Sequence, residues 1–310
     1  MTRFISDLSF QNKNIHTQDW ETHHLPLILG QISEHSQLQI DGFALDFSNE
    51  WSAIDIKTVV KSTRTITSDQ PLFIRSPRPA ATAQFLELAE REGINRPLAV
   101  GGLITGGGGV FGSDEEYLIR AVAKARCGLV ITPSRIDQQG IAGAEIDWIV
   151  HETGRALDWA ITRGAPGPIF LDALAWPATI DPVGTRRSLK LVKAFKAEFP
   201  DANTLLDSKV VGYGSAAALH SALLKIYIAA AVGTGTDYVS TPFESATTRR
   251  LVSIANHESE PLYDDEFFLQ KLIELDSWEA ISSILSNEIS PILQEAAYQL
   301  FLSDPLLMSL

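Results

Sequence analysis

One carboxylate is distinguished by the residues that precede it. Asp172 directly follows the apolar stretch Ile169-Phe-Leu171, and a Trp-Pro turn comes shortly afterwards. An apolar run of this kind is typical of a buried strand, and in a parallel sheet the residue that ends a strand lies at the edge where ligands bind. A carboxylate there can accept hydrogen bonds side by side from two N–H groups of a ligand. The alternative is that Asp172 only caps the following loop, because Asp is a common turn residue.

Polar residues and glycines follow other apolar stretches in the same way. Because the carboxyl ends of parallel strands share one edge of a sheet, we expect these residues to lie together and to form a binding site there. The candidates for this site are Asp46, Asn49, Arg75, Ser76, Arg78, Gly102, Thr132, Asp172, Gly212, Ser215 and Ser240. The glycine run Gly106–Gly109 is interpreted as a lid or a flexible connection and not as a phosphate cradle, since barrels bind phosphate after their seventh and eighth strands.

The elements that must position these residues alternate between strand and helix. Apolar runs such as Leu129-Val-Ile131 precede stretches with apolar residues at i, i+3 and i+4, and Lys209-Val-Val-Gly212 is the predicted seventh strand. Such alternation predicts a parallel sheet with right-handed crossovers. An eighth strand within the first ten residues would complete a barrel. No dinucleotide fingerprint or P-loop occurs, so we predict an α/β fold of the (β/α)8 TIM-barrel type instead of an open sheet.

The alternation of predicted strands and helices ends at about residue 262, and only helices are predicted after it. The sequence therefore predicts a barrel over residues 1–262 and a C-terminal helical extension over residues 263–310. The apolar residues of the extension either pack under the barrel or form the contact of a homodimer, and both interpretations remain open.

Composition excludes several classes of partner. The net charge is −13, and no basic run is present that could bind a nucleic acid. The first residues lack the apolar core of a signal peptide, and no segment is long enough to span a membrane, which predicts a cytoplasmic protein. Cys127 is the only cysteine, so neither an intrachain disulfide nor a Cys-rich metal site is expected. No metal ligand set is predicted.

Residues 40–245 resemble the pterin-binding barrels, a family that includes the methyltetrahydrofolate and methyltetrahydromethanopterin methyltransferases and, more distantly, the dihydropteroate synthases. The resemblance depends on short motifs that occur in the family's order. They are Leu45-Asp46, Ser76-Pro77 with Pro79, Leu171-Asp172 before the Trp-Pro turn, Gly212-Tyr-Gly-Ser215, and Gly235-Thr-Asp237 followed by Thr241-Pro242.

The resemblance implies one-carbon transfer between a reduced pterin, tetrahydrofolate or tetrahydromethanopterin, and a corrinoid. In that interpretation Asp172 holds the pterin, Asp46 supports it, and Ser215 donates the hydrogen bond that helps to polarise N5. The Asp-x-His-x-x-Gly pattern of corrinoid-carrying domains is absent. The resemblance therefore implies that the corrinoid is carried by a partner protein.

The chain also departs from the family's pattern. Arg75 and Arg78 occupy positions where the family has Asp and Asn, and Gly101-Gly102 replaces an Asn-Ser pair. The arginines either bind an anion such as a phosphate, or Arg75 neutralises a buried carboxylate, with Asp46 and Asp172 as candidates. Two alternatives to methyl transfer follow. One is a condensing enzyme similar to dihydropteroate synthase, in which the arginines hold a phosphate-bearing substrate, and the other is a barrel subunit that has lost catalysis.

Overall fold

The computed structural model describes residues 2–8, 22, 25–35, 40–46, 56–65, 70–76, 78–94, 98–105, 111–133, 145–242, 246–275, 277–286 and 288–302. Within these residues, eight parallel strands close into a barrel in chain order. They are β1 (Arg3–Asp7), β2 (Gly42–Asp46), β3 (Leu72–Arg75), β4 (Leu98–Ile104), β5 (Gly128–Thr132), β6 (Ile169–Asp172), β7 (Asn203–Asp207) and β8 (Tyr238–Thr241). The predicted (β/α)8 fold is confirmed, and β1 is the strand expected in the first ten residues.

Helices alternate with the strands and then continue beyond the last one. They are α2 (Leu25–His35), α3 (Ile56–Thr65), α4 (Pro79–Arg91), α5 (Ser113–Ala125), α6 (Ile146–Thr162), α7 (Pro182–Glu198), α8 (Ala217–Gly233), α9 (Ala246–Ala255), α10 (Asp264–Glu274), η2 (Trp278–Ser283), α11 (Pro291–Ala297) and η3 (Tyr298–Leu302). In the described part of the chain, no helix is both long and apolar enough to span a membrane.

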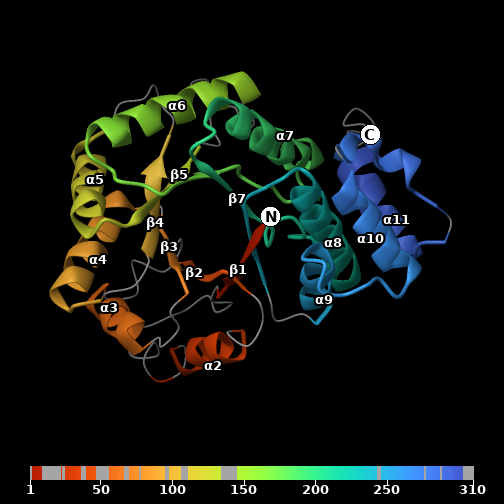
Figure 1. Cartoon of the computed structure of the whole chain (residues 1–310), viewed down its shortest axis with the longest axis horizontal. Helices are drawn as coiled ribbons and strands as arrows, with labels where there is room; N and C mark the ends of the chain where they lie inside the picture. Colours follow the sequence, from red (N-terminus) through yellow and green to blue (C-terminus); the bar gives the residue numbers. More distant parts are fainter. Residues whose placement is uncertain are drawn as a thin grey trace. The chain divides into compact units, whose positions relative to one another are not determined.

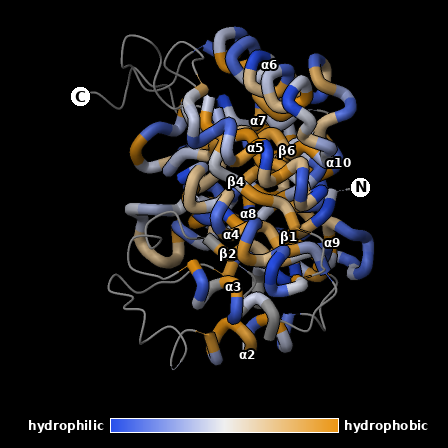
Figure 2. Tube along the Cα trace, turned by 90° about the vertical axis from the view of Figure 1, so that its left-hand side faces the viewer, coloured by the Kyte–Doolittle hydropathy of each residue, from blue (hydrophilic) through white to orange (hydrophobic). Residues whose placement is uncertain are grey.

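The internal contacts divide the chain into two compact units. One comprises residues 5–171 and the other comprises residues 1–4 together with 172–310. In the first unit, α3 to α6 lie outside the strands β2 to β5 (Figure 1). Figure 2 shows hydrophilic and hydrophobic residues alternating along α6, as expected of a helix with one face on a core.

The rings of Phe73 and Phe170 identify the inner face of the strands in the first unit. Their centroids are 5.1 Å apart in an edge-to-face arrangement. Phe73 belongs to β3 and Phe170 to β6, and these strands are not neighbours in the barrel. Two side chains on such strands can meet only inside it. Residues at alternate positions, such as Arg75, therefore project to the inside as well.

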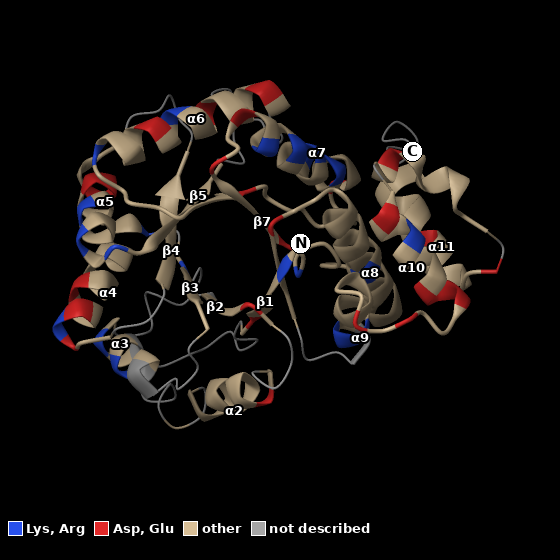
Figure 3. Ribbon diagram, viewed as in Figure 1, with Lys and Arg blue, Asp and Glu red and all other residues tan. Residues whose placement is uncertain are grey.

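In the second unit, the middle of α8 is buried on nearly all sides. Its residues Ala222–Leu224 and Ile226–Ala231 are all buried, and Figure 3 shows it nearly free of charged side chains. A helix that is apolar all round must be covered on more than one side, and α10 and α11 both pack against it. The end of α8 approaches α10 closely, since a Cβ at Gly233 would lie 2.8 Å from the carbonyl oxygens of Leu272 and Ile273.

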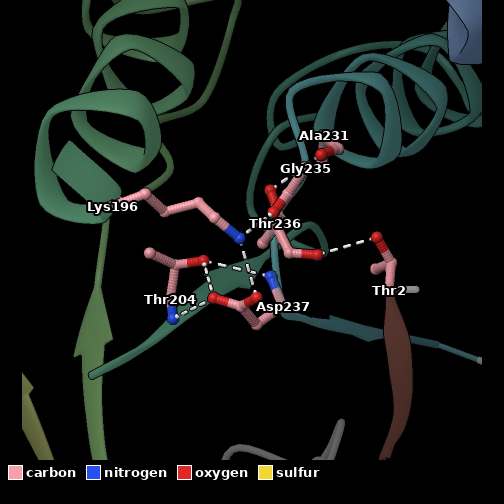
Figure 4. Close-up of polar contacts among 7 residues, drawn as sticks. All are labelled: Thr2, Lys196, Thr204, Ala231, Gly235, Thr236 and Asp237. Carbon is pink, nitrogen blue, oxygen red and sulfur yellow. Dashed lines mark hydrogen bonds and ion pairs between the residues drawn. The ribbon is translucent and has the colours of Figure 1, made fainter. Parts of the chain in front are cut away.

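Asp237, just before β8, joins several elements of the second unit (Figure 4). Its Oδ1 accepts a hydrogen bond of 2.8 Å from Lys196 on α7, and its Oδ2 accepts from the backbone N–H and the hydroxyl of Thr204 on β7. Its carbonyl oxygen accepts from the N–H of Arg3, where β1 begins. The Thr2 hydroxyl donates to the neighbouring carbonyl of Thr236 at 2.7 Å. This cluster therefore ties β1, β7, β8 and α7 together at the amino-terminal ends of the strands.

Two strand boundaries differ from the sequence prediction. The seventh strand is Asn203–Asp207, and the predicted strand Lys209–Gly212 lies in the turn that follows it. The predicted strand was wrong because the Val-Val pair was taken for its centre, whereas the pairing runs through Leu205 and Leu206. The fourth strand continues to Ile104, so Gly101 and Gly102 lie within β4 and not after it.

Candidate functional site

In the first unit, the carboxyl ends of β1 and β3 bring opposite charges together. Arg75 Nη1 lies 3.4 Å from Asp7 Oδ2, and the Asp7 side chain is completely buried. These strands are separated by β2, so the pair forms inside the barrel. Arg75 is therefore paired with a buried carboxylate, but the partner is Asp7, which was not one of the predicted candidates Asp46 and Asp172. Sequence reasoning missed Asp7 because it lies in a short N-terminal strand without a visible helix after it.

The neighbouring candidates Ser76 and Arg78 form the start of α4. The buried Ser76 hydroxyl accepts a hydrogen bond of 3.1 Å from the Arg78 backbone N–H, and the Arg78 side chain is exposed. Asp46 is paired in register with Arg75, which places its backbone at the same level of the barrel. The Asp46 side chain, Asn49 and the Gly106–Gly109 run lie outside the part of the chain that the structure describes.

Gly102 and Thr132 have different surroundings. Gly102 lies in an irregular stretch of β4 with a φ of +117°, and a Cβ there would come within 3.3 Å of Pro79 and Thr82. Glycine is therefore required by the close packing of β4 on α4. Thr132 ends β5 and is half-buried, and its carbonyl accepts the N–H of Thr105 at 3.0 Å. Thr132 thus lies at a strand end as predicted, while Gly102 does not.

In the second unit, Asp172 ends β6 and its carboxylate is held in one orientation. Oδ1 accepts a hydrogen bond of 2.9 Å from the Leu174 N–H, and Leu174 has a left-handed φ of +50°. Asp172 lies two positions after the inward-facing Phe170, so its half-buried side chain also projects to the inside. The contact with the turn is therefore observed, and the binding of a ligand by Asp172 stays a prediction.

Asp207 and Lys209 form a second charged pair at the end of β7. Lys209 donates its backbone N–H to Asp207 Oδ1 at 3.1 Å, and its Nζ lies 3.8 Å from Oδ2. The Lys209 side chain is only 12% exposed and the Asp207 side chain 19%. Sequence reasoning missed this pair because it placed the strand too late. A usable signal was present, since Leu205-Leu206-Asp207 repeats the pattern of Phe170-Leu171-Asp172.

Ser240 is the register partner of Asp207 and lies one residue before the end of β8. Thr204 is three positions before Asp207 in β7, so the two side chains face opposite sides of the strand. Thr204 contacts Lys196 of α7 through Asp237 and faces the helices, so Asp207 and its register partner Ser240 face the interior. Ser240 is fully buried, and within the described residues its hydroxyl has no hydrogen-bond partner. A buried hydroxyl without a partner costs free energy, so this position favours a ligand that supplies one.

Tyr227 of α8 lies close enough to both carboxylates to sense their charge. Burial raises the pKa of its hydroxyl above the ordinary value, the hydrogen bond with Ser188 opposes this, and the negative charges of Asp172 and Asp207 add to the rise. The phenol therefore stays neutral and remains a hydrogen-bonding group in the wall behind these aspartates.

Gly212 and Ser215 lie in the turn between β7 and α8. The Ser215 hydroxyl donates to the Gly212 carbonyl at 2.5 Å, and His220 Nδ1 contacts the same oxygen at 2.9 Å. The Ser215 proton is thus engaged within the turn, and its proposed donation to a pterin N5 stays a prediction. No group of three or more metal-ligating side chains occurs in the described residues.

Comparison with solved structures identifies a group of barrels with the same arrangement. The dihydropteroate synthase from Clostridium difficile, determined in the presence of pteroic acid, matches with a TM-score of 0.54 and 14% identity over 83% of this chain and 96% of its own. The enzyme from Xanthomonas albilineans with 4-aminobenzoic acid gives a TM-score of 0.55 and 11% identity over 84% and 94%. This chain has the fold of the dihydropteroate synthases.

The similarity to these synthases is structural, and at such identities it establishes the fold. A dihydropteroate synthase from Coxiella burnetii, in complex with pteroic acid, also matches, with a TM-score of 0.54 and 12% identity over 83% of this chain and 92% of its own. No family model matches the sequence, and no curated protein matches it. The resemblance to pterin-binding barrels is thereby confirmed at the level of the fold.

Proposed function

We propose that this barrel binds a pterin-like ring at the carboxyl ends of its strands and acts as a condensing enzyme similar to dihydropteroate synthase. The oriented carboxylate of Asp172 carries the proposal. It projects into the barrel from the end of β6 and is fixed by the Leu174 N–H. A fixed carboxylate can accept paired N–H donors from the amino-pyrimidine edge of a pterin, and such charge-assisted bonds are strong and directional.

Asp207, Lys209 and Ser240 support the same proposal. They lie at the ends of the adjacent strands β7 and β8 in the same unit as Asp172. Lys209 supplies an N–H donor for a ring carbonyl, and the buried Ser240 hydroxyl can bond to a ligand deep in the barrel. Donors and acceptors are thus combined in one unit, as a heterocycle with both kinds of edge requires.

The condensing reaction is supported over methyl transfer by the solved structures that share the fold, which are dihydropteroate synthases. In this proposal an aromatic amine such as 4-aminobenzoic acid displaces the phosphate-bearing leaving group of a pterin and loses one proton. The phosphate contact that the sequence assigned to Arg75 and Arg78 stays a prediction, and Arg75 is engaged with Asp7. Nothing observed in the chain or its structural matches supports a corrinoid partner.

Calorimetric titration with pteroic acid tests the binding step. We expect saturable binding by the wild type, weakened about tenfold or more in Asp172→Asn, because a charge-assisted hydrogen bond contributes roughly 1.5 to 3 kcal/mol. Asp181→Asn is the matched control. Asp181 lies on the same β6–α7 connection but caps α7 by accepting the Gly184 N–H at 2.8 Å. Failure of the wild type to bind, or equal binding by Asp172→Asn, would refute the proposal.

Turnover is tested separately. The wild type is incubated with a pterin diphosphate and 4-aminobenzoic acid, and the condensed product is sought by mass spectrometry. Product formation that depends on Asp172 and Lys209 is the expected result. Binding of pteroic acid without any product would identify the third possibility, a barrel that keeps its ligand site but has lost catalysis.

A further inference from the structure

His220 lies near the start of α8, in the same unit as Asp172 and Asp207. It belongs to the first turn of α8, which follows the β7 end at Asp207 through the turn that contains Gly212 and Ser215. In a parallel barrel this connection lies on the ligand-binding side. The imidazole is half-buried, and the half-exposed ring of Tyr213 lies next to it, with centroids 6.4 Å apart.

The hydrogen bond at Nδ1 determines which ring nitrogen carries the proton. Nδ1 lies 2.9 Å from the Gly212 carbonyl oxygen, and a carbonyl oxygen can only accept. Nδ1 must therefore be protonated and act as the donor. In the neutral imidazole this leaves Nε2 with a lone pair, so Nε2 is an acceptor. Within the described residues, no hydrogen bond is made to Nε2.

The turn before α8 is built to hold this ring. A Cβ at position 212 would lie 2.6 Å from the imidazole ring, so only glycine allows the ring to rest against the backbone there. Gly214 has a φ of +84°, which closes the turn tightly and favours glycine as well. Ser215 donates both its N–H and its hydroxyl to the Gly212 carbonyl, which fixes the oxygen that orients His220.

A second connection braces the same turn. The hydroxyl of Thr179, in the segment between β6 and α7, donates to the Tyr213 carbonyl at 2.5 Å. The segment that follows Asp172 and the segment that follows Asp207 are therefore joined at Tyr213, whose ring lies next to that of His220. An imidazole that is fixed at Nδ1, packed on glycine and left without a partner at Nε2 is prepared to accept one hydrogen bond from outside the protein.

We propose that His220 is a ligand-binding residue whose Nε2 accepts a hydrogen bond from an N–H or O–H group of the ligand in the barrel. This role rests on the proposed pterin site and adds to it a neutral acceptor beside the carboxylates. The exposed face of Tyr213 borders the same position, so the donor group belongs to a flat ring or to a substituent close to one.

Nitrogen-detected NMR of the histidine side chains tests the tautomer. The measurement is made at about pH 8, above the ordinary imidazole pKa of about 6.5. We expect the His220 signals of the neutral Nδ1–H form in the free protein and a shift of the Nε2 resonance when pteroic acid is added. A neutral Nε2–H form, or an Nε2 resonance that does not move in the pteroic acid complex, overturns the proposal.

Substitution tests the contribution to affinity. His220→Asn keeps a side-chain donor for the Gly212 carbonyl but has no acceptor at the Nε2 position, so we expect a native fold and about tenfold weaker binding of pteroic acid. His257→Asn is the control, since His257 is an exposed residue after α9. If the wild type binds no pteroic acid, the proposed function fails and the role of His220 with it. If the wild type binds and His220→Asn binds equally well, only the role of His220 is refuted.

Discussion

Arg75 and Asp7 show how a charged side chain at a strand end is accommodated inside the barrel. A guanidinium cannot be deprotonated, so placing one inside a barrel requires a partner. Asp7 supplies it from β1, with its carboxylate completely buried and 3.4 Å from Nη1. The pair explains how a guanidinium is accommodated at this strand end: Asp7 supplies an acceptor from another strand, and the two charges sum to zero.

Removing the cation of this pair should destabilise the fold, because the Asp7 carboxylate stays buried. We expect Arg75→Met to lower the free energy of unfolding by about 2 to 4 kcal/mol, because it leaves a buried charge without its counter-ion. Adding Asp7→Asn should restore a large part of that loss. Urea unfolding of the two single variants and the double variant measures the coupling. Arg78→Met, at an exposed position nearby, is the control and should change stability by less than about 0.5 kcal/mol. A loss in Arg75→Met no larger than this control would contradict the role of the pair.

Some strand-end residues could be predicted from the sequence and others could not, and the difference has a physical reason. Asp172 could be recognised because three apolar residues precede it and a Pro-containing turn follows it. Asp207 and Lys209 follow a strand of which only Leu205 and Leu206 are strongly apolar, so a competing Val-Val pair obscured its end. The Nδ1 contact of His220 depends on how the turn folds back on the helix, which residue spacing does not specify.

Helices and strands were easier to predict than single functional residues, because the spacing of apolar residues is read from many positions and one unusual residue does not hide it. The spacing of apolar residues predicted the helix α5 with its buried residues Leu118 and Val122. It also predicted α6 with the buried Ile149, although Ile161 of the same apolar pattern is exposed. The cluster around Asp237 could not be foreseen in this way. Its partners come from β7 and α7, more than thirty positions away, and only the closed barrel brings them together.

Asp237 should make the stability of the chain depend on acid. Burial raises the pKa of its carboxyl, but the hydrogen bonds from Lys196 and from the Thr204 N–H and hydroxyl outweigh this and hold the pKa below the ordinary value. A folded-state pKa lower than the unfolded one stabilises the fold fully above about pH 4, and this contribution is lost as the pH falls through the lower, folded value.

Asp237→Asn tests this dependence. We expect the variant to be less stable than the wild type at neutral pH, by about 1 kcal/mol for the weakened hydrogen bonds, and to lose less stability between about pH 4 and pH 2. Chemical unfolding at a series of pH values gives the slope. Asp201→Asn, at an exposed position before β7, should leave the slope unchanged. Parallel slopes for Asp237→Asn and the wild type would show that the cluster is not linked to proton binding.

For the whole molecule, the question is whether the C-terminal helices are an extension or part of the barrel's support. The sequence predicts a boundary at residue 262, yet the internal contacts group residues 172–310 with one another. The reason lies in α8, which is buried on the side of α10 and α11 as well as on the side of the strands. Phe268, Leu269 and Leu272 of α10 and Leu293 and Ala296 of α11 are buried in turn.

Removal of the C-terminal helices should therefore destabilise the barrel. A chain that ends at residue 262 would expose the covered face of α8, and we expect it to be insoluble or to melt at least roughly 10 °C below the full chain, since a few kcal/mol shift the melting temperature of a large domain by this amount. A chain that ends at residue 302 keeps every described helix and is the control. Size-exclusion chromatography of the full chain and the two truncated chains reports whether the predicted homodimer forms through these helices. If the chain ending at residue 262 melts with the full chain and remains soluble, the face of α8 needs no cover, and residues 263–310 are an appendage whose apolar surface serves another copy or another protein.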